Sequence, residues 1–218
     1  MSFSDELRSA HQDLWERTVT HPFVLELGEG TLPVEKFARY FVQDYIFVRT
    51  LAKVVGLAVA KAPSLEAAQP LSPFLHTLLN AEHDLFFRAF EELGVEPASY
   101  LNAESLPAGQ AIASFMLATA YDGTFDDIVT TLLVTEWTYY DWATRLAQAG
   151  KQPRHRMYWE WIDIHAAQEL GDFVTALRHH VDTAVPSDAA LRLKELFGAT
   201  LRYECQFWDM AYHGEELT

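Results

Sequence analysis

Apolar residues recur at helical spacing along nearly the whole chain, and this pattern restricts the possible folds more than any other feature. No segment shows sustained period-two alternation with β-branched residues and hairpin turns. The chain also has only 10 glycines and 9 prolines, fewer than an all-β protein rich in tight turns usually needs. The sequence therefore predicts an all-α fold.

Capping residues, glycines and prolines divide the pattern into segments. Thr124, followed three residues later by Asp127, resembles a capping box, and Gly94 and Gly150 are fitting helix stops. The sequence contains no repeat and no linker long enough to separate domains, so residues 1–218 are expected to form one domain. The helices are predicted at about 2–20, 31–61, 72–94, 110–121, 124–150, 154–168, 172–183 and 187–213.

The charge and cysteine content exclude several classes of partner. A net charge of -15 argues against nucleic acid, which is bound by clustered Lys and Arg. No apolar run approaches the ~18 residues that span a bilayer, so no membrane partner is expected. The single cysteine, Cys205, allows no intramolecular disulfide, and the first residues lack the apolar core of a signal peptide. We expect a cytoplasmic protein.

Three helix interiors carry a carboxylate among aromatic residues. Asp44 stands three residues before Phe47, Glu136 lies within "LVTEWTYYD", and Glu204 stands one turn before Phe207. A buried carboxylate is costly unless it is paired or hydrogen-bonded. The three helices could therefore build a common pocket, in which aromatic rings clasp a flat ligand and carboxylates bind its nitrogens. The alternative is that each carboxylate is solvated or salt-bridged.

The sequence predicts neither a metal site nor a cofactor. A di-iron bundle needs Glu-x-x-His repeats, but Glu82 and His83 are adjacent, as are His179 and His180. There is also no GxSxG elbow, no glycine-rich phosphate loop and no HExxH motif.

Several motifs occur in the order found in one known family. The segment "HPFVLELGEGTLPVEKFARYFVQDYIFV" contains HPF, a G-x-G-T-L-P turn and F-x-x-Y-x-x-Q-D-Y; W-x-Y-Y follows in the middle, and "YECQFWDMAY" near the end. In these motifs the chain resembles the TenA (thiaminase II) family over its whole length. The resemblance implies a heme-oxygenase-like helical bundle, usually a homotetramer. It also implies an enzyme that hydrolyses the aminopyrimidine part of thiamin or of its breakdown products.

The resemblance also implies roles for five residues. Asp44 matches the aspartate that binds the pyrimidine amino group and a ring nitrogen, and Phe47 an aromatic residue on which the ring stacks. Tyr139 matches a tyrosine that positions the nucleophile. Glu204 matches a glutamate that shuttles protons, and Phe207 the aromatic residue one turn beyond it.

The family's nucleophile is absent. Thr135 stands where the cysteine form of the family has its cysteine, and Cys205 should point away from the face of Glu204. Ile112 and His165 also replace pocket tyrosines. This pattern is closer to the class of the family that lacks the cysteine.

The loss changes the expected chemistry. An alkyl hydroxyl is far harder to ionise than a thiol, so covalent addition through Thr135 is not expected. A positioned water would replace it, with Glu204 or Glu136 as general base and acid. Alternatively, Glu136 forms a structural pair with Tyr140 or an arginine.

Three functions compete for this sequence. The first is cysteine-independent hydrolysis of a small-molecule aminopyrimidine by a homo-oligomer, either a dimer or a tetramer. The second is a pyrimidine-binding protein without turnover, and the third is a related bundle with different, oxidase-type chemistry. Asp44 and Glu204 favour the first function over the third, but nothing in the sequence separates the first from the second.

Overall fold

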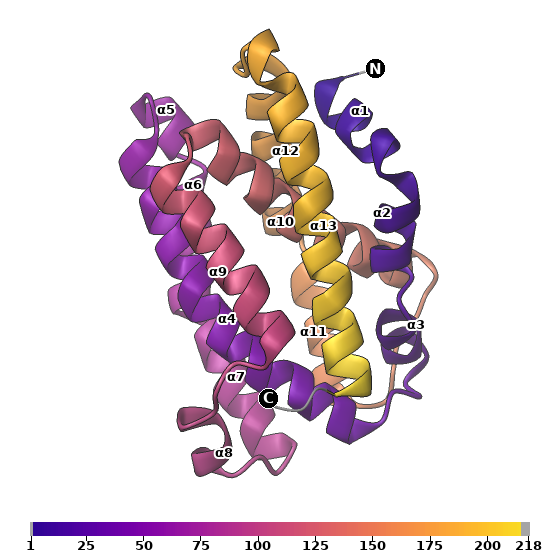
Figure 1. Ribbon diagram of the computed structural model, residues 1–218. Coiled ribbons are helices and arrows are strands. Elements are labelled where there is room, and N and C mark those ends of the chain that lie inside the picture. Colours follow the sequence, from indigo (N-terminus) through magenta and orange to yellow (C-terminus); the bar gives the residue numbers. More distant parts are fainter. Residues whose placement is uncertain (1, 215–218) are drawn as a thin grey trace.

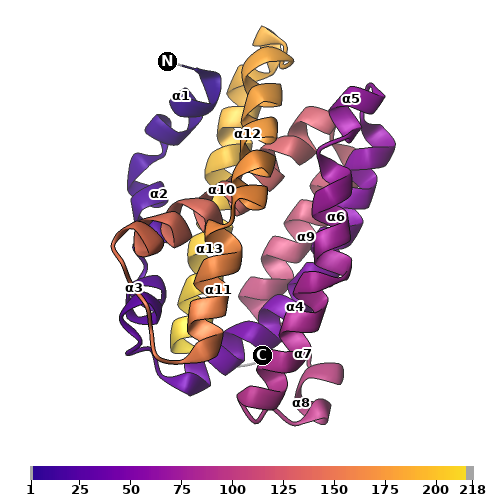
Figure 2. The ribbon, with the colours of Figure 1, turned by 180° about the vertical axis from the view of Figure 1, so that it is seen from behind.

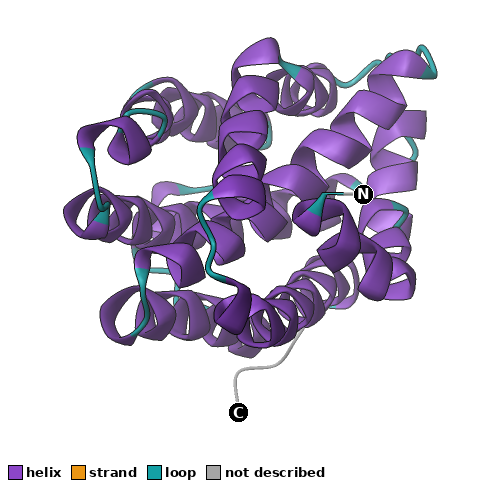
Figure 3. Cartoon of the chain, turned by 90° about the horizontal axis from the view of Figure 1, so that it is seen from above, coloured by secondary structure: helices purple, strands orange, loops and turns teal. Residues whose placement is uncertain are grey.

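The computed structural model describes residues 2–214, and this part of the chain contains helices and loops but no strand (Figure 3). The predicted all-α fold is therefore confirmed. The helices are α1 (Phe3–Ala10), α2 (Gln12–Val19), α3 (Pro22–Glu29), α4 (Val34–Lys61), α5 (Leu65–Ala68), α6 (Leu71–Leu79), α7 (Ala81–Glu92), α8 (Pro97–Leu101), α9 (Pro107–Asp122), α10 (Phe125–Gln148), α11 (Arg156–Ala166), α12 (Gln168–Thr183), the 3-10 turn η1 (Ser187–Ala189) and α13 (Ala190–His213).

The helices form two groups that face each other (Figures 1 and 2). Helices α4 to α9 lie on one side, and α1 to α3 with α11 to α13 lie on the other. Contacts of α10 and α13 with α4 and α9 join the two groups. None of the helices within residues 2–214 has the length and apolarity needed to cross a bilayer.

Two of the predicted helices are each broken into two. The helix expected over 2–20 stops at His11, whose backbone leaves the helical region and whose Nε2 lies 2.9 Å from the Lys194 carbonyl oxygen. The helix expected over 72–94 breaks at Asn80, whose side-chain amide donates to the His76 carbonyl at 2.8 Å. At Asn80 the side chain bonds a carbonyl one turn earlier and competes locally with the helical ladder, whereas at His11 the side chain ties the chain to α13.

Of the remaining helix boundaries, some differ from the prediction and others confirm it. Helix α3 lies where no helix was predicted, and it ends at Gly30, whose φ of 71° suits glycine. Short helices α5 and α8 occupy predicted connectors, and the last helix begins at Ala190, after the η1 turn. The capping box of Thr124 and Asp127 is confirmed, since both reciprocal hydrogen bonds are present.

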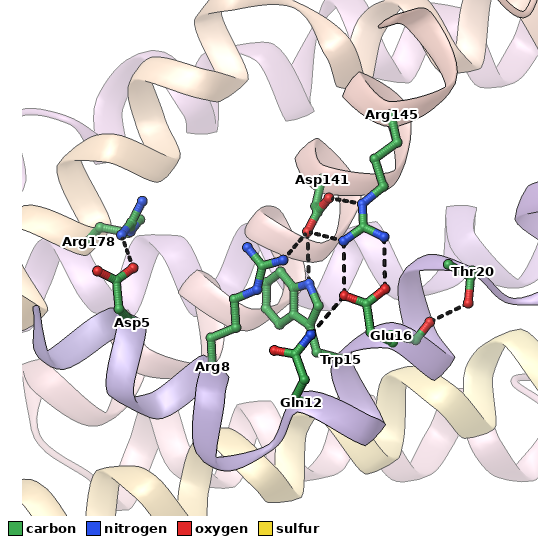
Figure 4. A network of polar contacts seen from close by, with 9 residues as sticks. All are labelled: Asp5, Arg8, Gln12, Trp15, Glu16, Thr20, Asp141, Arg145 and Arg178. Atoms are coloured by element: carbon green, nitrogen blue, oxygen red, sulfur yellow. Dashed lines mark hydrogen bonds and ion pairs between the residues drawn. The ribbon is translucent and has the colours of Figure 1, made fainter. Parts of the chain in front are cut away.

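The "LVTEWTYYD" segment anchors the N-terminal helices through its last residue. Asp141 accepts a hydrogen bond from Trp15 Nε1 at 2.8 Å and pairs with Arg8 and Arg145 (Figure 4). Arg145 also pairs with Glu16 at 2.8 Å. This network fastens α1 and α2 to α10, so Asp141 is a structural residue.

Candidate functional site

A cavity of about 610 Å³ lies among helices α4, α6, α7 and α9 to α13. Its walls are largely apolar, and the Phe74 and Phe173 rings stack on each other 4.2 Å apart at one wall. The structure places all nine residues selected from the sequence around this one space. They are Asp44, Phe47, Ile112, Thr135, Glu136, Tyr139, His165, Glu204 and Phe207.

Asp44 projects from the middle of α4 and is almost fully buried. Burial raises the pKa of its carboxyl group to about 7, while the Tyr40 hydroxyl one turn earlier acts in the opposite direction. The Tyr40 hydroxyl in turn lies 2.9 Å from that of Tyr139. Phe47, one turn further along α4, has its ring centroid 5.9 Å from that of Phe207. The Asp44 carboxyl group, which can form hydrogen bonds, and the rings of Phe47 and Phe207 thus line the same cavity.

Thr135 and Glu136 form a local pair on α10. The Thr135 hydroxyl lies 3.0 Å from Glu136 Oε1 and 3.1 Å from the Leu132 carbonyl oxygen. Burial raises the pKa of Glu136 to about 8, so its carboxyl group is largely protonated at neutral pH. The Thr135 hydroxyl has one proton to donate, and the Glu136 carboxyl oxygen and the Leu132 carbonyl oxygen are its two acceptors. Among the described residues, Glu136 bonds Thr135 and not Tyr140 or an arginine, the partners that the structural alternative expected.

Glu204 is buried at the cavity wall without a hydrogen bond or ion pair to any described residue. Burial raises the pKa of this carboxyl group well above its usual range, and the nearby charges of Glu136 and Asp44 act in the same direction. A buried polar group without a partner is costly. The side chain is therefore available to bond a ligand.

His165 faces the cavity as a neutral imidazole, because burial lowers its pKa to about 4. Its Nδ1 lies 2.8 Å from the Trp161 carbonyl oxygen, so Nδ1 carries the proton and Nε2 is left as an acceptor. The ring packs 5.0 Å from that of Tyr139. His165 thus adds an acceptor but no positive charge.

The sequence analysis missed three further carboxyl groups in the cavity lining, of which Glu169 and Asp172 are exposed and Glu82 is not. Glu82 lies on α7, is half-buried and lines the same space as Asp44 and Glu136. Burial, with the charges of those two groups, raises the pKa of Glu82 well above its usual range. A signal was available, since Leu85 and Phe86 stand three and four residues later and bury the same helix face.

Comparisons with known proteins place this geometry in a family. A profile of the TENA/THI-4/PQQC family matches residues 8–214. The chain belongs to this family. It is 31% identical to the aminopyrimidine aminohydrolase of Halalkalibacterium halodurans, over 98% of this chain and 96% of the relative.

Solved structures agree with the family assignment. A TenA homologue from P. horikoshii OT3 superposes with a TM-score of 0.90 at 27% identity, over 99% of this chain and 100% of that one. A Shewanella denitrificans OS217 domain with a heme oxygenase-like fold gives a TM-score of 0.75 at 13% identity, over 96% of this chain and 92% of that one. The predicted heme-oxygenase-like fold is confirmed.

Cys205 does not take the place of the cysteine nucleophile that this chain lacks at Thr135. Its Sγ lies 3.0 Å from the Thr18 hydroxyl, toward α2, and Cys205 is not among the residues that line the cavity. Burial also raises the pKa of the thiol, which disfavours the reactive thiolate. Only Thr135 occupies the position where the resemblance places a cysteine.

Proposed function

We propose that this protein is a cysteine-independent hydrolase that removes an amine from an aminopyrimidine breakdown product of thiamin. The observation that carries the proposal is the convergence of Asp44, Glu136 and Glu204 on one largely apolar cavity, with the pKa of each carboxyl group raised. Carboxyl groups whose pKa values are raised inside a cavity suit general acid–base catalysis. The full-length similarity to an aminopyrimidine aminohydrolase names the substrate class.

The pocket offers a complete binding site for a flat heterocycle. Asp44 would bond the ring amino group and the adjacent ring nitrogen, because a carboxyl group can donate and accept along one edge. Phe47 and Phe207 would contact the ring faces, and Ile112 would close the apolar wall. Tyr139, held by Tyr40, would orient the reacting part of the ligand.

The reaction replaces a carbon–nitrogen bond by a carbon–oxygen bond. A water attacks the carbon that bears the amine and gives its proton to one carboxylate, and the amine leaves with a proton. Glu204 and Glu136 supply these two functions. Because the charge of Glu136 raises the pKa of Glu204, ionising one of these two groups favours the protonated form of the other, which provides a base and an acid together.

A second candidate is a pyrimidine-binding protein without turnover, and Thr135 favours it. The hydroxyl cannot replace a thiolate, so the pocket could retain its ligand and lose its chemistry. For either candidate we expect a cytoplasmic homo-oligomer, either a dimer or a tetramer.

Direct assay separates the two candidates. The purified protein is incubated with 4-amino-5-aminomethyl-2-methylpyrimidine, and the hydroxymethyl product and ammonia are measured by chromatography and an ammonia assay. The hydrolase proposal expects equal amounts of both products. If neither the wild type nor Thr135→Cys forms product from a pyrimidine that calorimetry shows to bind, the binding function replaces the hydrolase.

A further inference from the structure

Glu82 has no counterpart among the residues that the family resemblance assigns, yet it lines the same cavity. The charges of Asp44 and Glu136 both act on Glu82, and the same two charges act on Glu204. Helix α7, which carries Glu82, packs on α4 and α6, and α13, which carries Glu204, packs on α4, α9 and α10. Asp44 therefore stands on α4, the helix that packs against both of the helices that carry Glu82 and Glu204.

These four carboxyl groups come from four different helices around the cavity, α4, α7, α10 and α13. Within residues 2–214, no three His, Cys, Asp or Glu side chains converge as metal ligands would. A ligand that contacts all four groups must therefore be extended and must present donors at more than one point.

No described lysine or arginine lines the cavity to balance these carboxyl groups. The basic side chain of the wall is His165, which is neutral. Glu204, buried and without a partner among the described residues, marks the cavity as incomplete without a ligand. A ligand that brings positive charge would favour ionised carboxylates and supply their missing partners.

We propose that Glu82 is a substrate-binding residue that, with Glu136, holds the protonated amine of an aminopyrimidine bearing an alkylammonium group. This inference rests on the proposed function, and it adds which residues recognise the positively charged group of the substrate. An ammonium has three donors and needs more than one acceptor. Asp44 is assigned to the ring and Glu204 to the attacking water, so Glu82 and Glu136 are the two of these four cavity carboxyl groups that remain for the ammonium.

The arrangement also orders the reaction. In this proposal the amine leaves between Glu82 and Glu136, and the attacking water stands beside Glu204. The carbon–nitrogen bond breaks toward the first pair, and the water proton passes to the Glu204 carboxylate. The product alcohol carries no charge and loses the ionic contact with Glu82, so substrate is held more tightly than product.

The test compares two ligands that differ only in this group, the 5-aminomethyl and 5-hydroxymethyl forms of 4-amino-2-methylpyrimidine. Calorimetry measures both dissociation constants in a Glu204→Gln background, where turnover is slowed. Adding Glu82→Gln should weaken binding of the amine by about 10- to 100-fold, the range for a hydrogen bond to a charged group, and leave the alcohol within about 2-fold. Glu169→Gln removes an exposed carboxylate from the same cavity's rim and serves as the matched control.

Glu82→Asp keeps the charge and should retain most of the preference for the amine. The proposal is overturned if Glu82→Gln weakens both ligands equally, if it weakens neither, or if the Glu204→Gln protein does not prefer the amine. These outcomes are independent of turnover. A wild type that binds the amine selectively through Glu82 but forms no product would leave this inference standing and remove the hydrolase function.

Discussion

The raised pKa of Glu136 makes the stability of this protein fall with pH, and Glu136→Gln should remove that dependence. In the folded protein the carboxyl group has a pKa of about 8, against an ordinary value of 4.5 in the unfolded chain. Between these two values the unfolded chain releases the proton and the folded protein keeps it. Raising the pH therefore favours unfolding, and this loss is complete only above the folded pKa.

The magnitude follows from the two pKa values. One unit corresponds to about 1.36 kcal/mol, so the wild type should lose about 3 kcal/mol from this group between about pH 5 and about pH 7.5. Glutamine does not titrate and can still bond Thr135, so the variant is spared this loss. The difference in the free energy of unfolding, variant minus wild type, should rise by about 3 kcal/mol over that range. For a chain of this size, the matching difference in melting temperature is roughly 6–12 °C.

Urea denaturation of both proteins at three pH values measures this difference directly. Asp44, Glu82 and Glu204 titrate in both proteins. The charge of Glu136, which raises the pKa of Glu82 and Glu204, is absent from the variant, so its removal spares further loss of stability and acts in the same direction as the expected rise. Glu169→Gln, which removes an exposed carboxylate from the cavity rim, provides the matched control. A difference that is constant within about 0.5 kcal/mol from pH 5 to pH 7.5 would show that Glu136 is ionised in the folded protein and refute the argument.

Four further outcomes are expected. Glu204→Gln should lower kcat for the aminomethylpyrimidine by about 10²- to 10⁴-fold, because general acid–base catalysis is worth that factor. Thr135→Ala should lower kcat by only about 10-fold, the effect of a lost hydrogen bond. If steady-state kinetics show the larger loss for Thr135→Ala, the water mechanism is excluded. Thiol reagents should leave activity intact, since Cys205 is buried against Thr18 outside the cavity lining, and inactivation that tracks labelling of Cys205 would contradict this. Intact thiamin should be cleaved slowly or not at all, which product analysis can check. Light scattering should report a homo-oligomer, and a monomer over a wide concentration range would count against it.

The sequence by itself determined the fold class and nine of the residues that line the cavity. Helical periodicity without period-two alternation was sufficient for an all-α prediction, because the burial of apolar residues at a spacing of 3.6 depends only on local pattern. Asp44, Glu136 and Glu204 stood out because carboxylates among aromatic residues need a partner or a ligand. The motifs around Asp44, Tyr139 and Glu204 then indicated the family.

Only the tertiary structure decided what these residues face. Glu136 and Asp141 lie five residues apart on one helix, yet Glu136 enters the cavity and Asp141 joins the arginine network with Trp15. Helical spacing shows that these two side chains point in different directions from the helix axis. It does not show which neighbouring helix each side chain contacts. The breaks at His11 and Asn80 depend on side-chain bonds, and that at His11 involves Lys194, far along the chain. The sequence analysis missed Glu82 because its immediate neighbours on α7 are exposed. The sequence alone does not show that this side chain lines a cavity with residues of α4 and α10.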